Sequence, residues 1–332
     1  MTILGHSIPN RPANSSLDSV PCGGKDLLTV AGIPANQVLR LLQIAHDLKA
    51  MDRSSRASQW LAGMTLGLLF EKPSTRTRVS FEAGMNQLGG QAIFLPAEKI
   101  QLSRGESLAD TALVLSRYLD GLVVRTYDQA VLEEWARYAT VPVINGLTDL
   151  CHPCQALADL LTITEKKGRL NGLKLAYVGD GNNIANSLME ASAKVGMHIS
   201  IGCPSGYEPD QRITDWAREI AAQSGAAIEI SHDPAVAAKG ADVLYTDVWT
   251  SMGQEKEQSR RLKALAPYQL NETLLAVARP NAIVMHCLPA HRGEEIAAAV
   301  LDGPQSVVLD QAENRLHMQK AILTEWLGRP WS

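Results

Sequence analysis

The stretch Met64-Thr-Leu-Gly-Leu-Leu-Phe70-Glu-Lys-Pro-Ser74-Thr75-Arg76-Thr77-Arg78 joins a short apolar run to the start of an amphipathic pattern. The apolar run over 64–70 is typical of a buried strand. The helical pattern that follows extends over 76–88. A strand that leads directly into a helix is the repeating unit of an α/β fold.

The same alternation of strand and helix patterns continues on both sides of this stretch. Further strands are predicted at 91–95, 121–125, 141–145, 173–178, 198–202, 227–230, 243–246 and 282–286. Helices are predicted at 34–50, 107–119, 128–139, 154–167 and 311–327. The polar segment 164–172 separates two such series. We therefore expect two α/β domains, each with a central parallel sheet, and an active site in the interdomain cleft.

The expected domains span 25–165 and 166–310, with a flexible tail over 1–24 and a C-terminal helical segment, 311–332, that packs back on the first domain. The tail lacks the basic and apolar regions of a signal peptide, and a transit peptide is disfavoured because Arg11 is its only basic residue. The chain has 332 residues, 45% hydrophobic and 20% charged, with a net charge of −4. This balance excludes a disordered chain and gives no general support for binding nucleic acid or anionic lipid.

Membrane and disulfide-rich classes are also disfavoured. The uncharged segment 57–70 is too short and too polar to span a bilayer. Five cysteines in a chain of this length do not form a disulfide framework. We expect a cytoplasmic protein.

The motif Ser74-Thr75-Arg76-Thr77-Arg78 has the composition of an anion site. Hydroxyls and free backbone N–H groups at a helix start favour an anion, and Arg76 and Arg78 would add charge-assisted hydrogen bonds. Arg125 ends a neighbouring strand and would reach the same edge of the sheet. The alternative is an ordinary helix cap followed by solvated arginines.

Cys151-His152-Pro153-Cys154-Gln155 follows the fourth predicted strand and opens a helix. As a C-x-x-C motif it would suggest a thiol-disulfide redox centre, although it lies mid-chain rather than early in a small domain. Alternatively, His152 and Gln155 act as donors that polarise a carbonyl oxygen, as acyl transfer requires. No tetrahedral set of metal ligands accompanies them.

Val178-Gly179-Asp180-Gly181-Asn182-Asn183-Ile184 lies between a strand and a helix, as a dinucleotide motif does. Ile184 occupies the third glycine position, and the next strand ends without an acidic residue, so NAD binding is disfavoured. Asn183 either faces a ligand or caps the helix.

Two further loops carry groups suited to an amine substrate. Asp247 precedes Ser251-Met252-Gly253 and either pairs with an ammonium group or forms a turn. In His286-Cys287-Leu288-Pro289, Cys287 is either a nucleophile or a hydrogen-bond partner.

Four of these motifs, each at the end of a predicted strand and in this order, resemble those of the aspartate/ornithine carbamoyltransferase family, and within it the ornithine enzymes. They are the segments 74–78 and 152–155, Asp247 with Ser251-Met252-Gly253, and the segment 286–289. The resemblance covers nearly everything from Asp26 to the C-terminus. It implies transfer of a carbamoyl group from carbamoyl phosphate to the δ-amine of ornithine, in arginine biosynthesis or in the reverse, catabolic direction, without metal or cofactor. It also implies a homotrimer or a multiple of trimers.

The resemblance assigns residues to each substrate. It places carbamoyl phosphate against Ser74, Thr75, Arg76, Thr77, Gln101 from a neighbouring subunit, Arg125, His152, Gln155, Cys287, Leu288 and Arg315. It places ornithine against Asn183, Asp247, Ser251 and Met252. Among these, the implied catalytic residues are Arg125, His152, Gln155, Asp247 and Cys287.

The sequence also bears on which amine accepts the carbamoyl group. Cys287 and Ala290 stand where the aspartate enzymes carry a proline and an arginine, which favours ornithine over aspartate. Putrescine or acetylornithine is the alternative acceptor. A thiol-disulfide oxidoreductase using Cys151 and Cys154, or a non-catalytic amino-acid-binding protein, remains as an alternative from another class.

Overall fold

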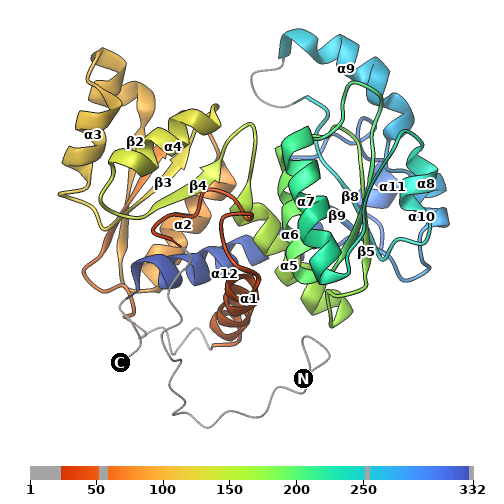
Figure 1. The fold of residues 1–332 in the computed structure, drawn as a ribbon, viewed down its shortest axis with the longest axis horizontal. Helices are drawn as coiled ribbons and strands as arrows, with labels where there is room; N and C mark the ends of the chain where they lie inside the picture. Colours follow the sequence, from red (N-terminus) through yellow and green to blue (C-terminus); the bar gives the residue numbers. More distant parts are fainter. Residues whose placement is uncertain (1–23, 52–58, 251–254, 329–332) are drawn as a thin grey trace. The chain divides into compact units, whose positions relative to one another are not determined.

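The computed structural model describes residues 24–51, 59–250 and 255–328, and it divides them into two compact units. The first unit contains the described residues up to Leu161 together with those from Asn314 onward, and the second contains Thr162–Glu313 (Figure 1). Each unit is an α/β structure with one parallel sheet, which confirms the predicted fold class.

The sheet of the first unit has the strand order β2-β1-β3-β4. Its strands are β1 (Thr65–Phe70), β2 (Gln91–Pro96), β3 (Gly121–Arg125) and β4 (Val143–Leu147). Its helices are α1 (Ala35–Ala50), α2 (Thr75–Gln87), α3 (Leu108–Leu115), α4 (Gln129–Tyr138), the first part of α5 (Pro153–Lys167) and the last part of α12 (Val308–Leu327), with the 3₁₀ helices η2 (Ala97–Lys99) and η3 (Gln101–Arg104).

The register of this sheet brings the ends of three strands, and the loops that follow them, to one edge. Phe70 at the end of β1 lies opposite Arg125 at the end of β3, and Arg125 lies opposite Leu147 at the end of β4. The loops that follow these strands carry the serine-threonine-arginine motif and His152. The strands themselves are apolar and buried because helices cover both faces of the sheet.

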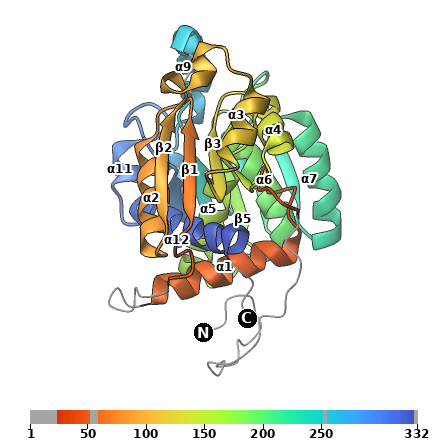
Figure 2. The ribbon, with the colours of Figure 1, turned by 90° about the vertical axis from the view of Figure 1, so that its left-hand side faces the viewer.

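Helices α1 and α12 lie side by side in the first unit (Figure 2). Lys49 of α1 donates to Asn314 of α12 over 2.7 Å, and Arg40 pairs with Glu325 at 3.0 Å. The end of the chain therefore completes a structure that begins near residue 25.

The sheet of the second unit has the order β7-β6-β5-β8-β9. Its strands are β5 (Lys174–Val178), β6 (His198–Gly202), β7 (Ile228–Ser231), β8 (Val243–Thr246) and β9 (Ile283–His286). Its remaining elements are α6 (Asn183–Val195), α7 (Gln211–Ser224), α8 (Pro234–Ala238), η4 (Glu255–Glu257), α9 (Gln258–Leu265), η5 (Ala266–Tyr268), α10 (Glu272–Val277) and α11 (Ala298–Leu301).

In this unit, α6 and α7 cover one face of the sheet, and α8, α10 and α11 lie over the other (Figure 1). The apolar core on the second face contains Val178, Leu244 and Val284 from three adjacent strands. Thr246 lies opposite His286 at the ends of β8 and β9, so the loops that begin at Asp247 and Cys287 start side by side.

The predicted elements are confirmed, but some of their bounds differ. The helix expected over 107–119 ends at Leu115, because the N–H groups of Arg117 and Tyr118 donate three residues back and tighten the chain. The fourth strand begins at Val143 rather than 141, and the last helix begins at Val308 rather than 311.

Candidate active site

The start of α2 forms an anion site of the expected kind. Ser74 is the N-cap, and its hydroxyl accepts the backbone N–H of Thr77 over 3.2 Å. The first turn contains no acidic residue. Its remaining N–H groups and the positive end of the helix dipole therefore favour a phosphate.

Arg315 reaches this helix start from α12. Its guanidinium donates to the Thr77 hydroxyl over 2.6 Å, and both side chains are buried. The two residues are 238 positions apart in the sequence. Helix α12 thus supplies a positive charge to the loop that follows β1.

His152 is an uncharged group among positive charges. Burial, followed by the charges of Arg315, Arg125 and Arg76, holds the pKa of its imidazole well below the ordinary value. The ring is therefore neutral near pH 7, where it offers one N–H donor and one acceptor. The same interactions place all three arginines and His152 in one cluster of the first unit.

The Gln155 amide is bonded through its nitrogen but not through its oxygen. One N–H of this amide donates to Asp159 over 2.8 Å. Its Oε1 is buried and has no hydrogen-bond partner among the residues that the structure describes. Gln155 therefore presents a buried acceptor for an N–H group, in addition to the donor role that the sequence suggested.

Arg78 does not join the arginine cluster as the sequence suggested. Its guanidinium donates to Glu82 over 2.9 Å and lies 3.8 Å from the centre of the Phe94 ring. The i,i+4 pairing and the stacking on β2 direct it along the outside of α2. Gln101 lies on the exposed η3, and Thr75 is exposed at the start of α2.

Lys72 is a residue that the sequence analysis missed. It is buried, forms an ion pair with Asp149 in the loop after β4, and lies 4.1 Å from the centre of the Tyr127 ring. Its carbonyl accepts a hydrogen bond from Arg125 over 3.2 Å. Lys72 thus links the loops after three strands, and a lysine within Glu-Lys-Pro gives no sequence signal that it is buried.

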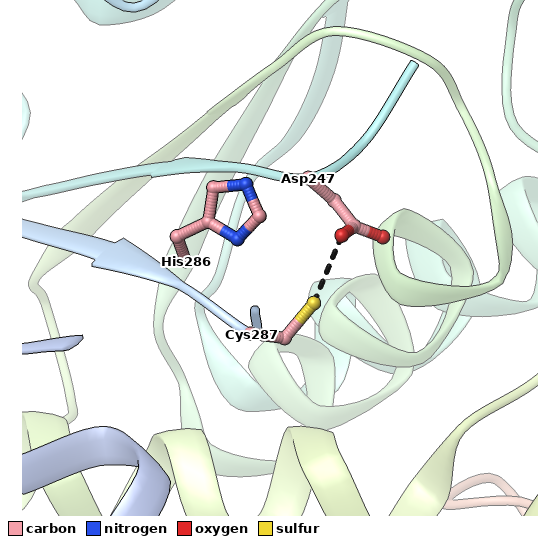
Figure 3. Close-up of side chains that lie close together, drawn as sticks. All are labelled: Asp247, His286 and Cys287. Atoms are coloured by element: carbon pink, nitrogen blue, oxygen red, sulfur yellow. Dashed lines mark hydrogen bonds between the residues drawn. The ribbon is translucent and has the colours of Figure 1, made fainter. Parts of the chain in front are cut away.

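Asp247 is the centre of a hydrogen-bonded group in the second unit. Cys287 donates to Oδ1 over 2.9 Å, as Figure 3 shows, and Asn182 donates to Oδ2 over 2.8 Å. Asp247 is buried, and Cys287 is half-buried. The structure thus brings two of the predicted residues into contact and adds a third, Asn182.

The helix cap that the sequence analysis considered for Asn183 is provided by Asn182 instead. The Asn182 side chain accepts the N–H groups of Ile184 and Ala185, so Asn182 is the N-cap of α6. Asn183 is the first residue of the helix and is buried. Sequence could not choose between two adjacent asparagines, because both are favoured at this position.

His286 holds the backbone of the Cys287 loop. Its Nδ1 accepts the N–H of Leu288 over 2.9 Å, and its Nε2 lies 3.1 Å from Glu295. Leu288 has a φ of 58°, which is strained for a residue with a side chain, and a cis peptide bond joins it to Pro289. Burial acts to raise the pKa of Glu295, but hydrogen bonds from His286 and from the backbone of His291 lower it.

Asp247, His286 and Cys287 each offer a ligand atom, and these atoms lie within 4.8 Å of one another (Figure 3). Both nitrogens of His286 are already engaged, and Asp247 is bonded to Cys287. The donor set therefore favours a hydrogen-bonded network over a metal site.

The glycines of the dinucleotide-like motif are explained by the conformation and packing of the chain itself. A Cβ on Gly181 would lie 2.3 Å from the backbone nitrogen of Pro209. Gly179 has a φ of 140°, which residues with a side chain rarely adopt. Neither glycine requires a bound pyrophosphate as its explanation, which further disfavours NAD binding.

The C-x-x-C thiols are poorly suited to redox chemistry. Cys151 and Cys154 are free and fully buried, and burial raises the pKa of Cys154 to about 12. Thiol-disulfide exchange requires a thiolate, which is scarce at neutral pH for such a group.

Ser251, Met252 and residues 1–23 of the expected tail lie outside the described residues. Within the described ranges, no helix combines the length and apolar character needed to cross a membrane.

Comparison with known proteins identifies the family. The model of the aspartate/ornithine carbamoyltransferase carbamoyl-P binding domain matches residues 25–165, and that of the Asp/Orn binding domain matches 171–325. The chain is 53% identical to the anabolic ornithine carbamoyltransferase of Pyrococcus furiosus, over 93% of this chain and 98% of that protein. It is 55% identical to the ornithine carbamoyltransferase of Syntrophus aciditrophicus, over 90% and 98% of the two chains.

Solved structures agree with the sequence matches. The ornithine carbamoyltransferase structure from Pyrococcus furiosus gives a TM-score of 0.88 at 53% identity, covering 92% of this chain and 98% of that one. The enzyme from Gloeobacter violaceus gives a TM-score of 0.84 at 52% identity, covering 93% and 100%. With both domain models matched in order and these relatives aligned over nearly their whole length, the chain belongs to the aspartate/ornithine carbamoyltransferase family.

Proposed function

We propose that this protein transfers the carbamoyl group of carbamoyl phosphate to the δ-amine of L-ornithine, giving L-citrulline and phosphate. The observation that carries the proposal is the cluster of Arg76, Arg125 and Arg315 around a neutral His152 in the first unit. Relatives that are more than half identical over nearly the whole chain are named ornithine carbamoyltransferases, which supports the same acceptor.

In the proposed donor site, hydroxyls, helix N–H groups and guanidinium groups hold the phosphate of carbamoyl phosphate. The proposed ligands are Ser74, Thr75, Arg76, Thr77, Arg125 and Arg315. The neutral His152 donates to the carbonyl oxygen, and Gln155 Oε1 accepts from the carbamoyl N–H₂. These contacts stabilise the negative charge that develops on the carbonyl oxygen and on the leaving phosphate.

In the proposed acceptor site, Asn183, Asp247, Ser251 and Met252 hold the amino-acid part of ornithine, and Cys287 and Leu288 flank its amine. An alkyl amine has a pKa near 10.4, so it must lose a proton before it attacks. The amine nitrogen then forms a bond to the carbonyl carbon, and the bond from that carbon to the phosphate oxygen breaks. Asp247 and Cys287 are the groups beside the amine, and both remain candidates for receiving its proton.

We further propose that different segments of the chain bind the two substrates. Residues 25–165 bind carbamoyl phosphate, residues 166–310 bind ornithine, and the helix within 311–332 returns Arg315 to the donor site. Gln101 on η3 reaches the donor site of a neighbouring subunit in a homotrimer or a multiple of trimers. Its exposure is consistent with such a contact. The cytoplasmic location stays a prediction of the sequence.

The proposal is tested by offering carbamoyl phosphate with ornithine, putrescine, acetylornithine or aspartate in turn. We expect citrulline from ornithine and at least about tenfold lower kcat/KM with each other acceptor, because an unpaired buried polar group costs more than 1 kcal/mol. A higher kcat/KM with putrescine or acetylornithine than with ornithine would change the proposed acceptor but not the proposed carbamoyl transfer. No carbamoylated product with any amine would overturn the proposal.

A further inference from the structure

The amide of Gln155 is held in one orientation by a neighbour on its own helix. Gln155 and Asp159 are four residues apart on α5, so they lie on the same side of the helix. The amide nitrogen of Gln155 donates to Asp159 Oδ1 over 2.8 Å. Gln155 is 1% exposed and Asp159 is fully buried.

The Asp159 carboxyl group fixes which way this amide points. Carboxylate oxygens only accept hydrogen bonds, so they attract the amide nitrogen and turn the amide oxygen away. That oxygen, Gln155 Oε1, is buried and lacks a partner within the described parts of the chain. A buried acceptor without a donor is unfavourable, and a ligand that brings an N–H group would relieve this cost.

We propose that Asp159 is a positioning residue that keeps Gln155 Oε1 turned out as an acceptor, and that the first unit thereby selects an acyl phosphate bearing an N–H₂ group. The inference rests on the proposed function and deepens it. Carbamoyl phosphate and acetyl phosphate have the same charge and nearly the same shape, but acetyl phosphate carries a methyl group where carbamoyl phosphate carries N–H₂. A fixed acceptor discriminates against the methyl group because it leaves the oxygen unpaired.

The substitution Asp159→Asn tests this role with little change of shape. The asparagine amide can either accept from the Gln155 N–H₂ group or donate to Gln155 Oε1, so it no longer holds the Gln155 amide in one orientation. The quantity measured is the selectivity ratio, defined as the inhibition constant of acetyl phosphate divided by the KM of carbamoyl phosphate in citrulline synthesis. We expect this ratio to fall several-fold in the variant.

Two reference variants show which values of the selectivity ratio to expect with and without discrimination. Gln155→Leu removes the acceptor and gives the value expected without discrimination. Asp120→Asn makes the same chemical change at the start of β1, where Asp120 accepts the N–H of Thr65 over 2.7 Å. We expect Asp120→Asn to keep the wild-type ratio.

The outcomes separate this inference from the proposed function. A ratio that moves toward the Gln155→Leu value supports it. A ratio that stays at the wild-type value, or a parallel loss of affinity for both phosphates, would show that Asp159 is only structural. If Asp159→Asn does not fold by circular dichroism, Asp159→Ala is measured in the same way. A wild-type enzyme that makes no citrulline would overturn the proposed function together with this inference.

Discussion

At the scale of single residues, the proposed donor site combines three arginines with an imidazole that carries no charge. The arginines provide attraction for a dianion. Burial, and after it the charges of the three arginines, hold the pKa of His152 well below its ordinary value. A neutral imidazole can donate to a carbonyl oxygen without adding to the charge already present. The three arginine charges therefore help to keep His152 in its neutral form.

The substitution Arg76→Ala tests the attraction for the dianion. Removal of a charge-assisted contact costs roughly 1.5–3 kcal/mol, so we expect kcat/KM for carbamoyl phosphate to fall at least about tenfold. Steady-state kinetics with saturating ornithine measures the effect. Arg78→Ala is the matched control, because Arg78 pairs with Glu82 and Phe94, and we expect a much smaller change. Equal losses in both variants would contradict the assignment of Arg76.

Residue types and approximate positions could be predicted from the sequence, but side-chain partners could not. The Ser74–Thr77 motif at a helix start and the placement of Asp247 and Cys287 after adjacent strands follow from local patterns. The N-cap role of Asn182 and the burial of Lys72 depend on contacts with residues far away in the sequence. The orientation of the Gln155 amide depends on Asp159, whose position on α5 carries no sequence signal by itself.

At the scale of elements, the start of α2 serves both stability and binding. Ser74 satisfies one N–H group of the helix and leaves others for an anion. The fold class and nearly all strands were predictable because buried parallel strands are short apolar runs and their helices are amphipathic. The observed end of a helix differs from the predicted end where the chain forms a 3₁₀-like turn, as after Leu115. Hydrophobic periodicity does not reveal how a helix ends.

The substitution Ser74→Ala is expected to affect both properties of α2. Loss of a serine N-cap costs about 1 kcal/mol of the free energy of unfolding. We also expect a higher KM for carbamoyl phosphate, because the hydroxyl is a proposed ligand. Asn271→Ala is the control, since Asn271 caps α10 with the same spacing, to the N–H of Leu274. Urea unfolding should show similar losses in both variants, whereas only Ser74→Ala should change the KM; an unchanged KM there would argue for a purely structural serine.

A buried ion pair joins the loop after β5 to α9 and makes stability depend on pH. Burial raises the pKa of Asp180 to about 6, although the charge of Arg261 opposes the shift and that of Asp247 adds to it. The folded protein therefore keeps this proton up to about pH 6, whereas the unfolded chain loses it near 3.8. Between these values the folded state binds more protons, so the contribution of Asp180 to the free energy of unfolding falls as the pH rises.

The variant Asp180→Asn lacks this contribution. We expect the stability of the wild type relative to the variant to fall by roughly 2–3 kcal/mol between about pH 4 and about pH 7. Loss of the contact with Arg261 adds an offset that is nearly independent of pH. Urea unfolding of both proteins across this range measures the difference, and parallel stability curves would refute the assigned pKa.

At the scale of the whole molecule, the chain builds its first unit from both ends and inserts the second unit between them. The two boundaries fall inside helices α5 and α12 rather than in loops. Sequence patterns could not locate these boundaries, because a helix that passes from one unit into another keeps its periodicity throughout.

Mixing of subunits tests the proposed trimer. A variant altered at Gln101 and one altered at Arg125 should each be inactive, because each lacks one part of every site. After dissociation and random reassembly at equal amounts, about a quarter of the sites would pair an intact Gln101 with an intact Arg125. We expect citrulline synthesis to return to about that fraction. No recovery after mass spectrometry has verified mixed trimers would place each site within one chain.

The position of Arg315 has a consequence for protein synthesis. The guanidinium that bonds to Thr77 belongs to a residue that is synthesised 238 positions later. The ribosome must therefore translate the whole second unit before this arginine exists. A nascent chain or truncated product that stops before Arg315 carries the serine-threonine-arginine motif but lacks the arginine that contacts it, so this contact forms only after the second unit has been synthesised.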